Sequence, residues 1–214
     1  MDNSGVRLFL TSAGVRGHVE ELTALVGDGA KVAVSANALD LVVSEDERAL
    51  WLGRELAALA RAGLAPYELD LRRAGAAALG DVDMLWATGG NAFVLRKALE
   101  RSGVGDALVA RLHDGSLAYG GSSAGACVCG PTLQGIELID DAYADGEPIF
   151  AGLGLVDFCV APHFEADGEA GETIARLVAH YRATGTPYRA LRDGEAVVIR
   201  DGDLTAIDCY RAEA

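Results

Sequence analysis

A serine between closely spaced glycines is the residue of this sequence best suited to nucleophilic chemistry. Gly121, Ser123 and Gly125 fit the pattern G-x-S-x-G, after a predicted strand and before an apolar run compatible with a helix. At such a turn the chain reverses so tightly that only glycine fits beside the exposed hydroxyl. The helix N-terminus supplies partial positive charge, and the Ala124 N–H would face a developing oxyanion. The pattern predicts Ser123 as a nucleophile, the alternative being an ordinary glycine-rich turn.

A serine nucleophile needs a base, and His163 is the best placed of the four histidines. It follows the apolar run Phe158 to Pro162, so in a parallel sheet it would emerge at the carboxyl edge beside Ser123. The others lie in or beside predicted helices: His18, His113 and His180. We expect His163 to be the general base, the alternative being a histidine satisfied by local hydrogen bonds.

A carboxylate should orient the base, and the segment between Ser123 and His163 offers three: Glu137, Asp140 and Asp141. Glu137 is flanked by apolar side chains, where a carboxylate is costly unless it has a buried partner. We predict Glu137 as the third member of the triad, with Asp140 as the next candidate and otherwise as a substrate contact. All three could instead be surface charges on a loop.

A second glycine turn, Gly89-Gly90-Asn91, also joins a predicted strand to a helix. Adjacent glycines allow the backbone to approach a ligand closely, so the Gly90 N–H is a candidate second oxyanion donor and Asn91 a candidate substrate contact. A phosphate-binding loop is less favoured, because neither G-x-G-x-x-G nor G-x4-G-K-[ST] occurs here.

The elements that must position these residues alternate between short strands and longer helices, which is typical of a doubly wound α/β fold. The predicted strands are 6–11, 31–35, 67–71, 84–88, 117–120 and 158–162. One helix should begin at the capping box of Ser44 and Glu47 and end at Gly63. The runs 196–200 and 204–208, joined by Asp-Gly-Asp, predict a C-terminal β-hairpin. We expect a mostly parallel sheet with helices on both faces, in a single domain over residues 1–214.

Composition excludes several classes of partner. The chain of 214 residues carries 18 Lys and Arg against 32 Asp and Glu, a formal net charge of -14 that disfavours nucleic acid and anionic membranes. We find no leader or membrane-spanning pattern and expect a cytoplasmic protein. The four cysteines lack zinc-site spacing, so we expect neither metal nor cofactor and interpret them as reduced, mostly buried thiols. They are Cys127, Cys129, Cys159 and Cys209.

Taken together, the motifs resemble the peptidase E family, which includes α-aspartyl dipeptidases and cyanophycinases. The resemblance rests on Gly89 to Phe93, Gly121 to Ala126, Pro162 to Phe164 and Gly171 to Thr173, which span about half the chain in the family's order. It implies a fold related to class I glutamine amidotransferases, metal-free hydrolysis of short peptides through an acyl-enzyme, and frequent homodimers. It also implies Ser123 and His163 as nucleophile and base, with Gly90 and Ala124 as oxyanion donors and Asn91 in the substrate site.

Two departures from the family pattern bear on mechanism and specificity. Aligning on Pro131-Thr132 puts Leu138 where the dipeptidase Asp falls, so the adjacent Glu137 resembles a Ser-His-Glu variant. Aspartyl dipeptidases also carry an Arg directly after Gly-Glu-Thr that recognises the acidic substrate side chain, where this chain has Ile174. Strict Asp-X specificity is therefore not expected, unless Arg176 substitutes for that Arg.

Our leading prediction is a serine exopeptidase acting on short peptides. Three alternatives stay open at this point. The same triad could hydrolyse non-standard acyl substrates such as β-aspartyl peptides, or the scaffold could serve as a non-catalytic binding protein. A cysteine-dependent activity at Cys127 or Cys129 is the least favoured, because Cys127 lies one helical turn beyond Ser123 and should be buried.

Overall fold

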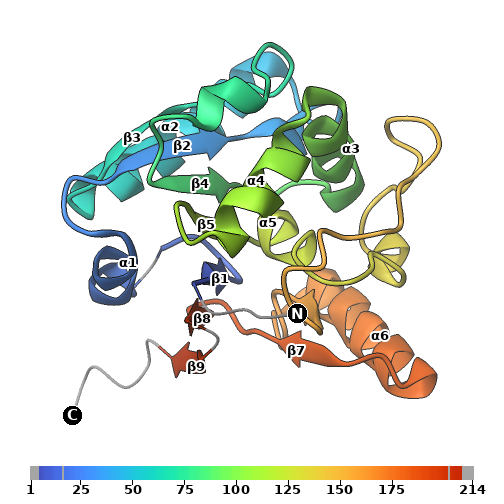
Figure 1. Ribbon diagram of the computed structural model, residues 1–214. Helices are drawn as coiled ribbons and strands as arrows, with labels where there is room; N and C mark the ends of the chain where they lie inside the picture. The colour runs from blue at the N-terminus through green and yellow to red at the C-terminus, as the bar shows by residue number, and fades with distance from the viewer. Residues whose placement is uncertain (1–4, 16, 202, 209–214) are drawn as a thin grey trace.

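The computed structural model describes residues 5–15, 17–201 and 203–208, which form an α/β fold built on a seven-stranded sheet (Figure 1). Along the sheet the strands run β3-β2-β4-β5-β1-β8-β9. The first five are mutually parallel, and β8 pairs antiparallel with both β1 and β9. Their bounds are β1 Arg7–Thr11, β2 Lys31–Ser35, β3 Ala65–Glu68, β4 Met84–Ala87, β5 Ala118–Ser122, β8 Glu195–Arg200 and β9 Asp203–Asp208.

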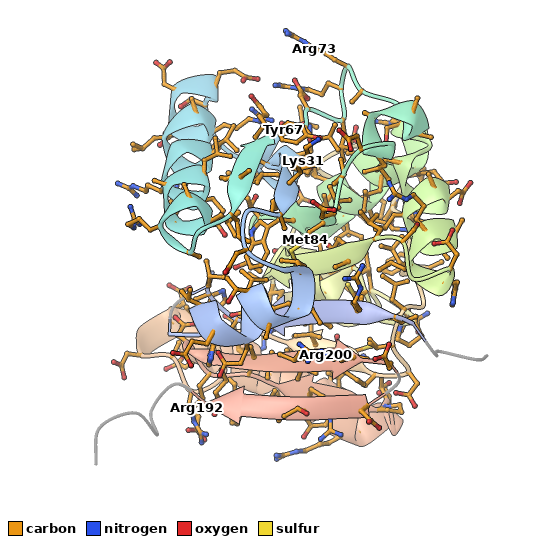
Figure 2. All side chains as sticks on the ribbon, turned by 60° about the vertical axis from the view of Figure 1, so that its left-hand side comes forward. Lys31, Tyr67, Arg73, Met84, Arg192 and Arg200 are labelled. Atoms are coloured by element: carbon orange, nitrogen blue, oxygen red, sulfur yellow. The ribbon has the colours of Figure 1, made fainter. Side chains whose placement is uncertain are left out.

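Helices cover both faces of this sheet, because the parallel strands carry apolar side chains on both faces. Figure 2 shows α2 on one side of the strands and the green α3 and α4 on the other. The helices are α1 Val19–Val26, α2 Glu45–Arg61, α3 Ala92–Ser102, α4 Val104–His113, α5 Ala124–Cys127 and α6 Gly168–Thr184. Single 3-10 turns lie at η1 Asn37–Leu39, η2 Ala76–Leu79 and η3 Ile136–Leu138.

Two buried clusters correspond to the two faces. Phe9, Val34 and Trp86 pack with leucines of α1 and α2 on one side. Leu10 and Tyr119 pack with α3, α4 and α6 on the other. Strands buried on both faces hold their ends rigidly, so the turns that follow β1, β4 and β5 have fixed positions.

The expected α/β class, the Ser44 capping box and the C-terminal hairpin are all confirmed. One placement was wrong. The run 158–162 does not join the main sheet, because β6 Cys159–Ala161 pairs parallel with β7 Tyr188–Ala190 in a separate two-stranded sheet. β7 was not predicted from the sequence, because a strand of three residues is too short to show a periodic pattern. The strand expected at 67–71 lies at Ala65–Glu68.

Among the residues that the structure describes, no helix combines the length and apolar character needed to cross a bilayer.

Candidate active site

Ser123 occupies a strained turn between β5 and α5. Its backbone has φ 51° and ψ -110°, a conformation that side-chain-bearing residues rarely adopt. The flanking glycines are sterically required: a Cβ on Gly121 would lie 2.4 Å from the carbonyl of Gly125, and one on Gly125 would lie 2.3 Å from the Ala87 oxygen. The turn therefore has the geometry of a nucleophile elbow, which exposes the serine hydroxyl at the end of the sheet.

A continuous chain of hydrogen bonds begins at this hydroxyl. His163 Nε2 lies 3.1 Å from Ser123 Oγ, and His163 Nδ1 lies 2.6 Å from Asp193 Oδ1. Because an ionised carboxylate can only accept, the proton on the neutral ring resides on Nδ1. Nε2 is then free to accept the proton of the Ser123 hydroxyl. This is the arrangement by which a histidine activates a serine.

Ser12, at the end of β1, links the base and the carboxylate. Its hydroxyl donates to Asp193 Oδ1 at 2.8 Å and accepts from the His163 backbone N–H at 2.7 Å. Asp193 itself lies on the connection between β7 and β8. The buried His18 contacts the next residue, with Nε2 2.7 Å from the Gly194 oxygen. Asp193, Ser12 and His18 were not among the site residues predicted from the sequence.

The predicted contact between Glu137 and His163 is corrected by the structure. Glu137 is exposed in η3, and its carboxylate accepts from the Gly135 N–H at 2.7 Å. Its apolar neighbours, Ile136 and Leu138, had suggested a buried partner for the carboxylate. They belong to this short 3-10 turn, in which the Glu137 side chain faces solvent. Asp193 lies against His163 Nδ1 in the position that Glu137 was expected to fill.

Gly90 follows β4 and lines the same cavity as Ser123 and Ala124. Its φ is 139°, and a Cβ there would lie 2.3 Å from the Ala38 oxygen in η1. Within the residues that the structure describes, the Gly90 N–H and the Ala124 N–H donate no hydrogen bond. Both are thus available to a ligand.

Asn91 serves as a helix cap and does not line the cavity. Its Oδ1 accepts from Phe93 and Val94 at the start of α3, and its Nδ2 donates to the Asp141 oxygen at 2.8 Å. With its amide so occupied, the predicted direct substrate contact is not supported. Arg176 is likewise exposed on α6 and absent from the cavity lining, since the positions that α6 contributes are Glu169, Ala170, Thr173 and Ile174.

The cavity beside Ser123 has a volume of about 430 Å³. Asp140, predicted as a substrate contact, lies in its wall, and its Oδ2 accepts from the Ala92 N–H at 2.8 Å. Burial raises the pKa of this carboxyl to about 6. Ile174 also lines the cavity, whereas no Lys or Arg is among the described lining residues.

Comparison with known proteins decides the family. The model of peptidase family S51 matches residues 40–207. The chain belongs to peptidase family S51. An uncharacterised peptidase of Listeria innocua is 31% identical over 152 residues, 69% of this chain and 71% of the relative. Peptidase E of Streptomyces coelicolor is 33% identical over 137 residues, 61% of this chain and 54% of its own length.

A solved structure agrees with these relatives. A Listeria monocytogenes protein described as a candidate peptidase E superposes with a TM-score of 0.81 and 25% identity, covering 95% of this chain and 98% of its own. The expected resemblance to peptidase E is confirmed, and the S51 member described here is a serine peptidase.

The described cysteines of this S51 peptidase are free and buried. Burial raises the pKa of the Cys127 thiol well above its ordinary value, and the negative charge of Asp140 adds to that effect. A thiol held neutral is a poor nucleophile, which argues against a cysteine-dependent reaction at Cys127. Cys209 lies outside the described residues. Within residues 5–15, 17–201 and 203–208, no cluster of three or more His, Cys, Asp or Glu could hold a metal ion.

Proposed function

We propose that this S51 peptidase is an exopeptidase that hydrolyses short peptides through an acyl-enzyme, with Ser123, His163 and Asp193 as its triad. The hydrogen-bonded chain from Ser123 Oγ through His163 to Asp193 carries this proposal. The cavity of about 430 Å³ supports a short substrate, because it holds only a few residues of peptide.

In the proposed reaction, Ser123 Oγ attacks the scissile carbonyl while its proton passes to His163 Nε2. The carbonyl oxygen becomes an oxyanion that accepts hydrogen bonds from the Gly90 and Ala124 N–H groups. When the intermediate collapses, the C–N bond breaks and His163 gives its proton to the leaving amine. Water then attacks the acyl-enzyme with His163 again as base, and Ser123 recovers its proton. Asp193 accepts from Nδ1–H throughout and stabilises the imidazolium.

The test is hydrolysis of a dipeptide and tripeptide library by the wild type and by Ser123→Ala, with products identified by mass spectrometry. Ser116→Ala is the matched control, because Ser116 is an exposed serine before β5. We expect turnover by the wild type and the control, and a loss of at least about 10³-fold in Ser123→Ala. Equal rates in all three proteins would refute Ser123 as nucleophile.

A homodimer, which the resemblance to peptidase E led us to expect, is a second part of the proposal. A sedimentation-velocity mass twice that of the 22.2 kDa chain would support the homodimer. A single species at the mass of one chain would exclude it.

A further inference from the structure

The cavity beside Ser123 combines apolar walls with one desolvated carboxylate. Ile139 and Ile174 contribute aliphatic surface, and Asp140 lines the same cavity. Glu169, the other acid among the described lining residues, is exposed on the first turn of α6. A site built this way suits a ligand group with a long apolar stem and a positive end.

The charge of Asp140 is only partly explained by contacts within the protein. One of its oxygens, Oδ2, accepts from the Ala92 N–H. Asn91 caps the next two N–H groups of α3 and leaves the buried Ala92 N–H to Asp140, but a neutral acceptor would satisfy that single donor as well as a carboxylate does. A charge that burial disfavours and the helix does not need is a candidate for a role in binding.

The location of Asp140 also calls for a cation during the reaction. Ala92, which donates to Asp140, lies two residues after Gly90, a proposed oxyanion donor. A carboxylate that lines the same cavity repels the negative charge that develops on the substrate carbonyl. A positive group of the substrate placed against Asp140 would cancel that repulsion.

We propose that Asp140, together with Ile139 and Ile174, forms the specificity pocket for a basic side chain on the acyl residue of the substrate. This inference rests on the proposed function of the same site. A lysine side chain places its methylenes against the two isoleucines and its ammonium against Asp140. An acidic side chain in this pocket finds a like charge and is rejected.

The experiment compares the dipeptides Lys-Ala, norleucine-Ala and Asp-Ala. Norleucine has the stem of lysine without the amine, so the ratio of kcat/KM isolates the side-chain charge. We expect the wild type to prefer Lys-Ala over norleucine-Ala by about 10- to 100-fold, and to disfavour Asp-Ala. In Asp140→Asn the preference should fall to near unity, whereas Glu169→Gln, which removes the exposed acid of the same cavity, should retain it.

Two results would overturn the proposal. One is a wild-type ratio near unity or a preference for Asp-Ala. The other is an equal loss for lysine and norleucine peptides in Asp140→Asn, which would assign Asp140 to the α-ammonium or to folding.

Calorimetric binding of the same peptides to Ser123→Ala separates this inference from the proposed function. A preference for Lys-Ala that Asp140→Asn removes would support the pocket even if the wild type proved inactive. Absence of turnover would then contradict only the proposed reaction. Binding with no preference would refute the pocket and leave the proposed reaction standing.

Discussion

Ser123 and His163 both have positive backbone φ angles, of 51° and 57°. Such conformations cost about 1–3 kcal/mol at non-glycine residues and persist only where surrounding contacts hold them. Here the end of β1 provides those contacts, since Thr11 accepts from the Ser123 N–H and Ser12 accepts from the His163 N–H. One strand end thus fixes the nucleophile and the base relative to each other.

The identity of the carboxylate beside His163 leads to the first prediction. Asp193→Asn should lower kcat by about 10²- to 10⁴-fold, because an amide cannot stabilise the imidazolium and favours the wrong tautomer. Glu137→Gln, which changes the carboxylate that the sequence suggested, should keep the wild-type rate. Steady-state kinetics on one dipeptide would measure both, with circular dichroism as the check on folding. The reverse pattern would restore Glu137 to the triad.

At the level of elements, Ser123, His163 and Gly90 could be found from the sequence, because each lies within three residues of the end of a strand. Asp193 could not, since its place depends on the loop between β7 and β8, and β7 is too short to show a period. The one local signal is the Asp-Gly pair before the final hairpin. The carboxylate was expected between Ser123 and His163, whereas Asp193 lies beyond both in the sequence. His163 also reaches Ser123 from a separate small sheet, an arrangement that periodicity does not reveal.

The turn between β4 and α3 is held against η1, which makes Gly90→Ala informative. The added methyl group would clash with the Ala38 carbonyl and displace the N–H proposed for the oxyanion. We expect kcat to fall by about 10²- to 10³-fold. Gly103→Ala is the control, because Gly103 also has positive φ, lies at the other end of α3 and has open space around it. If both variants lose activity equally, backbone strain rather than the oxyanion site explains the effect.

The cap of α3 gives a third prediction. Asn91→Ala should lower the free energy of unfolding by about 1 kcal/mol, measured by urea denaturation, because two N–H groups lose their acceptor. Asn91→Asp should retain the cap but replace the donation to the Asp141 oxygen with a contact between two acceptors. A raised KM with unchanged stability in Asn91→Ala would instead favour the direct substrate contact that the sequence predicted.

For the whole molecule, the formal net charge of -14 and the acidic cavity act in the same direction. Both attract cationic ligands and repel acidic ones, with the long-range part screened by salt over about 10 Å at 0.1 M. Burial of the Asp140 carboxylate lowers the stability of the fold, whereas the proposed binding of a cationic side chain needs its negative charge.

That conflict predicts a pH-dependent gain in stability for Asp140→Asn. The folded chain holds the pKa of Asp140 at about 6, above its ordinary value of 3.8. Below about pH 3 the carboxyl is largely neutral in both folded and unfolded chains. As the pH rises toward 7 the unfolded chain releases this proton first, so the wild type loses stability relative to Asp140→Asn, whose amide can still accept from Ala92.

We expect the two proteins to be nearly equal at about pH 3 and Asp140→Asn to be more stable by about 1 kcal/mol at pH 7, a value reduced for partial solvent exposure. Urea denaturation at both pH values measures the difference. Glu137→Gln, which removes an exposed negative charge from the same segment, controls for the change in net charge. A destabilised Asp140→Asn at pH 7 would mean that the carboxylate has a favourable partner within the fold, and would remove the argument that its charge is kept for a ligand.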